Sequence, residues 1–223
     1  MTRPVRTKRT CAVCGTVNDY IELASTNTMG GPDLDFRPAE MMRSTMGLWI
    51  QTCRKCGYVS TKIDEPCILP AEWFRSERYR TSDGLEFVSP LADEFYKQYM
   101  ICRENSDTEK ALEAVLHAAW ACDDANDIEN AVICRKLAID SASELIDGNS
   151  EDRTLLLLLK ADLLRRIGDF DRLVEEYANV RLDEERADKI LSFQIRKAKQ
   201  KDASCYRVED ALEVDAGYTI VIN

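Results

Sequence analysis

The second half of the chain repeats its apolar residues at the spacing of an α-helix. After Ser89-Pro90, the residues Leu91, Phe95, Tyr99 and Cys102 fall on one helical face. Proline suits the first turn of a helix, because the N–H that it lacks would have no intrahelical partner there. This stretch therefore predicts a helix that begins at Ser89-Pro90.

Capping signals predict further helices downstream. Their starts are Ser106 with Glu109 as a capping box, Asn126-Asp127, Ser150, and Asp169 directly after Gly168. A sixth helix is predicted over residues 183–201. The helix from Ser150 carries leucines around much of its axis, at positions 155, 156, 159 and 163, so we expect it to be central.

Two helix pairs align on their turns, "AND" at 125–127 and "IGDF" at 167–170. Ala119 and Ala161 lie seven positions before the two turns, where small side chains let paired helices approach closely. The stretch "GDFDRLVEEY" resembles a tetratricopeptide repeat, although the turns lie 42 residues apart (168 − 126) instead of 34. We interpret this half as an irregular tetratricopeptide-like array, with a plain helical bundle as the alternative.

The first half of the chain has the residue pattern of strands in place of helix periodicity. Its pattern predicts strands over 5–11, 15–23, 46–53 and 57–61. A short helix is predicted over 37–46, with a proline in its first turn and a glutamate near its positive end.

Four cysteines separate these strands in two identical motifs. Cys11 and Cys14 form the first Cys-x-x-Cys-Gly motif, and Cys53 and Cys56 form the second. A two-residue gap lets both thiolates of a pair face one ion, and the following glycine permits the positive φ that such a turn needs. Four thiolates suit tetrahedral Zn²⁺, so we expect two hairpin tips to share one structural zinc ion per chain, as in a zinc ribbon.

The two motifs are unusually far apart. Thirty-eight residues, 15–52, separate Cys14 from Cys53, which indicates an insertion in the common pattern of about fifteen to twenty residues. Iron and a redox-active dithiol are the alternatives to zinc. A redox pair usually precedes a helix, whereas these pairs lie between strands. Catalytic zinc is disfavoured, because four thiolates leave no position for water.

The other five cysteines are scattered singly, and the total of nine is odd. Secreted disulfide scaffolds do not show this pattern, so we expect reduced thiols in the core of a cytoplasmic protein. No run of about eighteen apolar residues predicts a membrane span, and no apolar region follows the basic start "MTRPVRTKRT" to make a secretory signal.

The net charge of −10 is unevenly distributed. Residues 1–64 hold nine Lys/Arg and six Asp/Glu, a net +3, whereas residues 65–223 hold 21 and 34, a net −13. An acidic body repels phosphate backbones, so nucleic acid is a disfavoured partner. A weak contact through the basic N-terminal arm is the alternative to a solvated arm.

A cluster of charges lies between the cysteine motifs, and its members are Asp33, Asp35, Arg37 and Glu40. It is a candidate polar site, with internal pairing that holds the loop as the favoured alternative. No phosphate-binding or dinucleotide-binding motif occurs. The sole histidine, His117, lies on an apolar helix, where a packed or rim position is favoured over a catalytic base.

The stretch "DLDFRPAEMMRSTMGLWIQTCRKCGYVS", together with "CAVCG", resembles an uncharacterised bacterial family. That family is a domain of unknown function, with paired cysteine knuckles ahead of a tetratricopeptide-like helical part. The resemblance is sharpest over residues 11–60. It implies that Cys11, Cys14, Cys53 and Cys56 are metal ligands, and it implies no activity.

We therefore expect an α+β fold, mainly α, with a small N-terminal zinc ribbon and an antiparallel, tetratricopeptide-like helical array. The expected parts are a ribbon with an inserted helix (1–64), a connecting segment (65–88), a helical domain (89–204) and a tail (205–223).

The expected function is non-enzymatic binding of a protein or peptide partner through the helical half. One alternative is an enzyme or regulator with the charged cluster as its site, at the junction of ribbon and helices. The other is weak nucleic-acid binding by the ribbon and its basic arm. The sequence specifies neither the partner nor the oligomeric state.

Overall fold

The computed structural model describes residues 2–148 and 151–213. Strands and short 3-10 turns fill the N-terminal part and α-helices the rest, which confirms the α+β, mainly α class. The strands are β1 (Arg3–Thr10), β2 (Val17–Ser25), β3 (Gln51–Thr52) and β4 (Val59–Ser60), and the 3-10 turns are η1 (Arg43–Leu48), η2 (Trp73–Arg75) and η3 (Ser82–Gly84). The helices are α1 (Glu77–Arg80), α2 (Pro90–Glu104), α3 (Thr108–Asp124), α4 (Ile128–Asp147), α5 (Arg153–Arg166), α6 (Phe170–Tyr177), α7 (Glu185–Lys199) and α8 (Val208–Glu213).

Two separate antiparallel hairpins carry the cysteine motifs. In the first, β1 pairs with β2, with Thr10 opposite Val17 at the tip. In the second, β3 pairs with β4, with Thr52 opposite Val59. The strands predicted over 5–11, 15–23 and 57–61 are therefore confirmed in position, although β4 is only two residues long.

The segment before the second motif differs from the prediction. The strand predicted over 46–53 shrinks to β3, and most of its sequence lies in or directly after η1. The helix predicted over 37–46 was also wrong in extent, since the helical turn begins only at Arg43. Trp49 explains part of this, because its indole N–H donates to the hydroxyl of Thr45, 2.9 Å away and one turn earlier. A short apolar run fits strand and helix equally well, and this local contact favours the turn.

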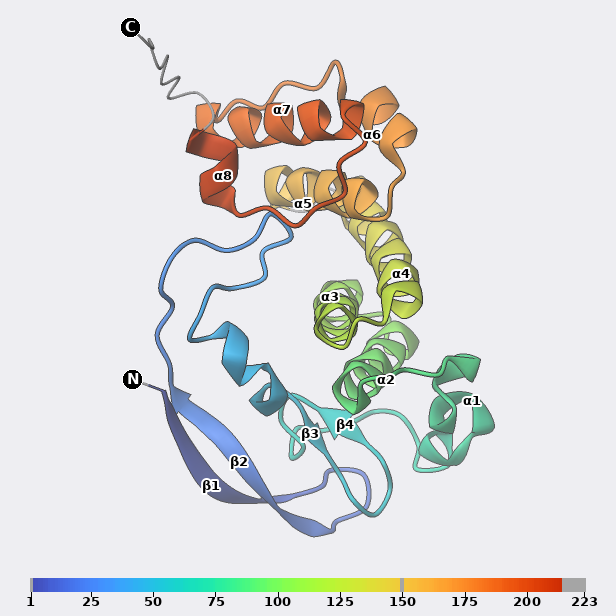
Figure 1. The fold of residues 1–223 in the computed structure, drawn as a ribbon. Helices are drawn as coiled ribbons and strands as arrows, with labels where there is room; N and C mark the ends of the chain where they lie inside the picture. Colours follow the sequence, from blue (N-terminus) through green and yellow to red (C-terminus); the bar gives the residue numbers. More distant parts are fainter. Residues whose placement is uncertain (1, 149–150, 214–223) are drawn as a thin grey trace, which may run out of the picture.

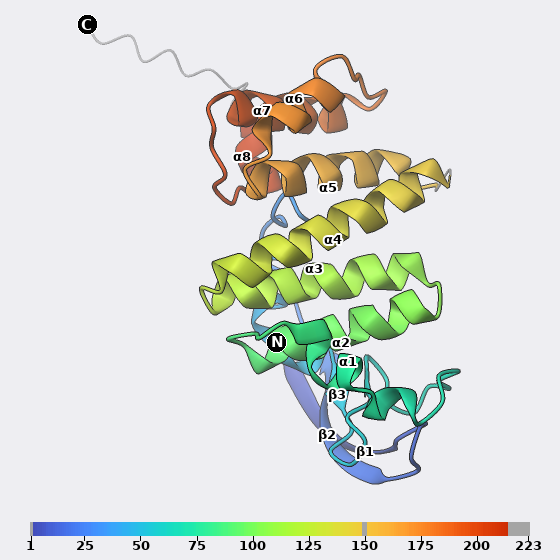
Figure 2. The same ribbon diagram turned by 90° about the vertical axis from the view of Figure 1, so that its right-hand side faces the viewer.

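The long helices stack in chain order. Figure 2 shows α2, α3, α4 and α5 lying across one another in successive layers, with α6 and α7 above them. Their shared interior is the main core, and it includes the close-approach alanines Ala119 and Ala161 at 1% and 0% exposure. The tetratricopeptide-like spacing of this array stays a prediction.

Three of the inter-helix turns share one geometry. Ser106, Asn126 and Gly168 have positive φ values of 55°, 56° and 78°. The next residue is an aspartate each time, and its N–H donates back to a carbonyl five residues earlier at 2.9 Å. This hydrogen bond is typical of a Schellman-type helix end. It gives a donor to a carbonyl near the end of the helix that has no N–H partner within the helix.

This geometry corrects one predicted cap. Ser106 is the left-handed residue that ends α2, and the N-cap of α3 is Asp107, whose carboxylate accepts from the N–H of Lys110 at 3.1 Å. Asp127 caps α4 as predicted. Ser150, the predicted start of the next helix, lies outside the described residues, and α5 is described from Arg153.

The four leucines predicted on this central helix, α5, differ in exposure. Leu156, Leu159 and Leu163 are buried, whereas Leu155 is 50% exposed. The predicted helix over 183–201 corresponds to α7. Of the predicted tail, Val208–Glu213 form α8, and residues 214–223 lie outside the described residues.

Residues 26–50, between β2 and β3, run along the helical stack, and we call this segment the insertion. Figure 1 shows the chain leaving β2, rising beside the helices to α5 and α8, and returning through η1 to β3. There Leu34 donates its N–H to the carbonyl of Tyr206, and Val208 donates to Pro32, at 2.9 and 3.0 Å. The insertion and the segment before α8 therefore meet in a short antiparallel contact. Over the described part of the chain, no helix has both the length and the apolar character to cross a membrane.

Candidate functional site

The four predicted metal ligands lie together. The Sγ atoms of Cys11 and Cys56 are 3.7 Å apart, and those of Cys14 and Cys53 are 3.6 Å apart. All four Sγ atoms lie within 4.8 Å of one another. Zn–S bonds of about 2.3 Å in a tetrahedron separate sulfurs by roughly 3.8 Å, so this arrangement fits one ion at its centre.

Equivalent turns position both pairs. In each turn, the glycine N–H donates to the carbonyl of the first cysteine at 2.9 Å, as Gly15 does to Cys11 and Gly57 to Cys53. The two glycines have φ values of 69° and 77°. Because only glycine adopts this conformation without steric cost, the residue after each second cysteine is explained by the turn.

The electrostatics of the cluster also favour a cation. Burial raises the pKa of Cys11 and of Cys56 above the ordinary value for a thiol. Burial alone would also raise the pKa of Cys14, but hydrogen bonds with Thr16 and with the neighbouring cysteines lower it to about 6. Several thiolates beside one another in a partly buried site would repel each other unless a counter-charge were present. A divalent ion would stabilise the thiolate form, and a metal centre is the chemistry that this donor set supports.

The second motif is attached to the helical half. The hydroxyl of Tyr79 on α1 donates to the carbonyl of Gly57 at 2.7 Å, and that of Thr52 donates to Glu94 on α2 at 2.7 Å. Behind the motif, Tyr58 packs edge-on against Phe74 with ring centroids 5.2 Å apart. The connecting segment therefore supplies an aromatic support between the cysteines and α2.

The candidate polar residues do not converge on one site. Asp33 pairs with Arg43 at 2.7 Å and also accepts from the Cys205 thiol at 3.4 Å. Glu40 is exposed and accepts from the Ser44 hydroxyl. Both side chains therefore make contacts within the insertion, and Asp33 also connects it to the segment before α8.

Asp35 and Arg37 instead bind the helices. Asp35 is 1% exposed, and its carboxylate accepts from the indole N–H of Trp120 at 2.9 Å and lies 3.7 Å from Arg166. Burial raises the pKa of Asp35. Arg37 pairs with Asp124 at the end of α3, with Nη2 and Oδ2 2.6 Å apart.

These contacts join a larger buried ion network that sequence reasoning missed. Asp123 pairs with both Arg135 of α4 and Arg166 of α5. Burial alone would raise the pKa of Asp123, but the two guanidinium groups outweigh it and lower the pKa. The sequence shows these charges on separate helices, and no spacing rule connects them. Only the stacking of α3, α4 and α5 brings them together.

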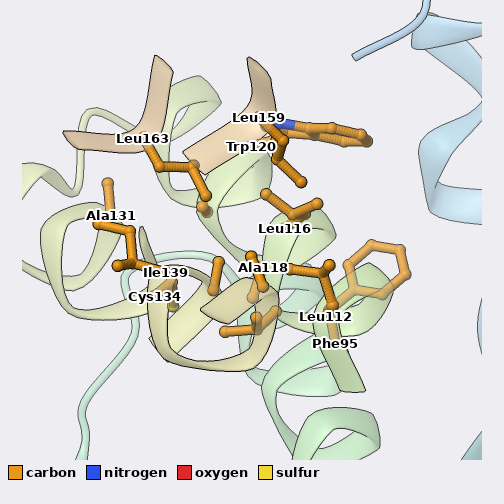
Figure 3. Packing of buried hydrophobic residues seen from close by; sticks show 14 of the residues in the cluster. Phe95, Leu112, Leu116, Ala118, Trp120, Ala131, Cys134, Ile139, Leu159 and Leu163 are labelled. Atoms are coloured by element: carbon orange, nitrogen blue, oxygen red, sulfur yellow. The ribbon is translucent and has the colours of Figure 1, made fainter. Parts of the chain in front are cut away.

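A pocket of about 640 Å³ lies between the insertion and the helical stack. Three elements supply most of its apolar lining, namely α3 (Leu112, Leu116, Trp120), α5 (Leu155, Leu156, Leu159) and the insertion (Phe36, Pro38, Met42). Figure 3 shows Leu112, Leu116 and Trp120 along α3, with Leu159 beside the indole of Trp120. Sequence reasoning placed the leucines of α5 in a central helix and did not find the pocket.

His117 lies in the wall of this pocket, among aromatic rings. Its ring centroid is 5.1 Å from that of Trp49, 5.0 Å from that of Phe95 and 5.0 Å from that of Trp120. Burial lowers the pKa of His117 to about 4, so the imidazole is neutral near pH 7. In the part of the chain that the structure describes, no side chain or backbone group forms a hydrogen bond with this imidazole.

Phe36, on the opposite wall, has a strained backbone. Its φ is 66°, a conformation that costs a non-glycine residue about 1–3 kcal/mol. The bond from its N–H to Asp33 and the bond from Asp33 to the carbonyl of Arg37, both 2.9 Å, hold the turn. The buried contacts of Asp35 and Arg37 flank Phe36 on both sides, and they fix this strained residue at the pocket.

Comparisons with protein-family models, with curated proteins and with solved structures found no match to this chain. The resemblance to the family of paired cysteine knuckles therefore rests on the quoted residues alone, and the function must be argued from the geometry.

Proposed function

We propose that this protein is a non-enzymatic binding protein, in which one structural zinc ion holds the N-terminal hairpins and the pocket receives part of a protein partner. The observation that carries the proposal is the pocket itself. It is about 640 Å³ in volume and mostly apolar, and both the insertion and the helices line it. Pockets of this volume and lining are typical of binding sites.

Zinc is the proposed metal because all four donors are cysteine sulfurs. Thiolate donors in a tetrahedral arrangement suit Zn²⁺ or iron, and the paired hairpin tips are typical of structural zinc sites. Four protein ligands leave no position for a substrate or water, so the ion would support the fold. A reducing compartment such as the cytoplasm would keep the thiols available.

The rival functions have less support. An enzyme that used the charged cluster would need its carboxylates free, but Asp33 and Asp35 are each paired with an arginine. Nucleic-acid binding by the basic arm would use β1, where Arg9 is already paired with Glu22 at 2.7 Å and with Asp64 at 3.3 Å. Both rivals stay predictions without a structural observation in their favour.

Capture of partners from the native cytoplasm tests the proposal. Leu155 is a half-exposed residue of the pocket wall, so Leu155→Glu should fold normally and block binding. Ile128, at 74% exposure on α4, is outside the pocket, so Ile128→Glu is a matched control. We expect one set of captured proteins with the wild type and Ile128→Glu, and its loss with Leu155→Glu. Capture that Leu155→Glu leaves unchanged would refute the pocket as the binding site.

A further inference from the structure

The pocket has charged groups of one sign only. Its lining contains the carboxylates Asp35, Glu109, Glu113 and Asp152, and among the described residues it contains no Lys or Arg. Glu109 and Glu113 are exposed and lie one turn apart on α3. A cationic group at this rim would therefore meet the negative charge of Glu109 and Glu113.

The apolar part of the pocket continues from these glutamates along the same helix. Glu109 and Trp120 are eleven positions apart, which corresponds to about 16 Å at 1.5 Å per residue. An extended peptide rises about 3.3 Å per residue, so about five residues match this length. The pocket is thus long enough for a short chain segment, which favours a peptide over a compact small molecule.

His117 adds a polar contact inside the apolar wall. As a neutral imidazole without a hydrogen-bond partner among the described residues, it can donate to one backbone group of a ligand or accept from another. It does not repel a cation, because it carries no charge near neutral pH. Apolar walls with a few polar groups that fix orientation are typical of specific binding sites.

We infer that the pocket binds a peptide segment of a partner protein, with an apolar side chain against Leu116, Trp120 and Leu159, and with a Lys or Arg beside Glu109 and Glu113. This inference rests on the proposed function and specifies its ligand. Aromatic and aliphatic contacts supply most of the affinity, and the rim glutamates select the charge of the flanking residues.

Matched synthetic peptides test the inference on the full-length, metal-loaded protein. We would use acetylated and amidated hexapeptides with two central leucines, flanked by two lysines or by two glutamates. Two of the three tryptophans, Trp49 and Trp120, line the pocket, so tryptophan fluorescence reports binding. At low salt we expect the lysine peptide to bind roughly tenfold more tightly, with a smaller ratio at high salt because exposed charges are screened.

Charge reversal provides the decisive variant. Glu109→Lys with Glu113→Lys should invert the preference toward the glutamate peptide. Asp171→Lys with Glu175→Lys is the control, because these exposed residues are one turn apart on α6, outside the pocket, and change the net charge equally. The control should keep the wild-type preference. Equal binding of both peptides by the wild type and both variants would overturn the inference.

The remaining outcomes separate the inference from the proposed function. Absence of binding by every peptide overturns the inference, while partner capture with Leu155→Glu still decides the proposed function. An alkylamine such as decylamine that binds more tightly than the lysine peptide would overturn the peptide assignment. A dimer in sedimentation that Leu155→Glu dissociates would instead assign the pocket to a second copy of this chain.

Discussion

The carboxylate of Asp35 accepts a hydrogen bond from the indole nitrogen of Trp120, 2.9 Å away and 85 positions later in the chain. Both residues are buried, at 1% and 4% exposure. This contact holds the insertion between the cysteine motifs against the middle of the helical stack. It also places Phe36 across the pocket from α3.

Asp35→Ala should destabilise the protein by about 3–5 kcal/mol. The change leaves the indole N–H of Trp120 without its acceptor and Arg166 without one of its two carboxylate partners, in a buried region. Chemical denaturation measures the loss. Glu40→Ala is the matched control, because this exposed carboxylate lies on the same insertion and should change stability by less than about 0.5 kcal/mol. Equal effects of the two variants would show that the buried contact carries no special stability.

The purified protein should contain about one zinc ion per chain, and Cys53→Ser should lose it. Cys53 is 1% exposed and lies 3.6 Å from Cys14, so a hydroxyl in its place removes one of four clustered donors. Cys67→Ser is the control, since this cysteine lies outside the cluster. Elemental analysis checks the ratio. A reduced, folded preparation without metal would refute the zinc assignment, and bound iron would replace it.

Removal of the metal should loosen the hairpin tips and leave the insertion in place. The N–H groups of Gly15 and Gly57 belong to the turns that position the four cysteines, so a chelator should speed their hydrogen exchange. The N–H of Leu34 bonds to Tyr206, remote from the cysteines, and should stay protected. Exchange measured by NMR distinguishes these sites. Loss of protection at all three amides would mean that the metal also holds the insertion, so that residues 1–64 loosen as one unit.

His117 should titrate with a pKa of about 4, well below the ordinary 6.5, because burial disfavours its charged form. It is the sole histidine, so its ring protons can be followed directly by NMR. The folded protein then binds fewer protons than the unfolded chain between pH 4 and 6.5. Stability should fall as pH falls through this window, by at most about 3 kcal/mol.

His117→Phe checks the same effect on stability. A phenyl ring keeps the aromatic contacts with Trp49, Phe95 and Trp120 but cannot take a proton. The variant should therefore lose less stability than the wild type between pH 6.5 and 4. An NMR titration near pH 6.5 would mean that water reaches the imidazole freely.

The aspartates that cap α3 and α4 should differ in their effect on stability. Asp107→Ala removes an exposed cap and should cost about 1 kcal/mol. Asp127 is 8% exposed, and its carboxylate also accepts from the N–H of Val88 at 3.0 Å. Asp127→Ala should therefore cost roughly 2–3 kcal/mol, since it also leaves that N–H without a partner. Thermal unfolding compares the two variants, and equal shifts in Tm would contradict the tertiary role of Asp127.

Local chemistry was enough to predict much of the fold. The cysteine spacing and the glycines of each motif act within a few residues, so the sequence determined the two hairpin tips and the cluster of Cys11, Cys14, Cys53 and Cys56. Helix periodicity likewise predicted α2 to α7, because an apolar stripe must be buried wherever the helix finally packs. The capping error at Ser106 was also local, since a serine followed by an aspartate offers two candidate caps.

The tertiary structure alone decided the pocket and the role of the charged cluster. From the sequence, Asp35 is one of four clustered charges between the cysteine motifs, and Trp120 and Leu159 are apolar residues on different helices. Their meeting depends on the path of the insertion and on the stacking of α3, α4 and α5, which arise from many weak contacts summed over the chain. A site built from residues so far apart has no local pattern, because the free energy that assembles it belongs to the packed molecule as a whole.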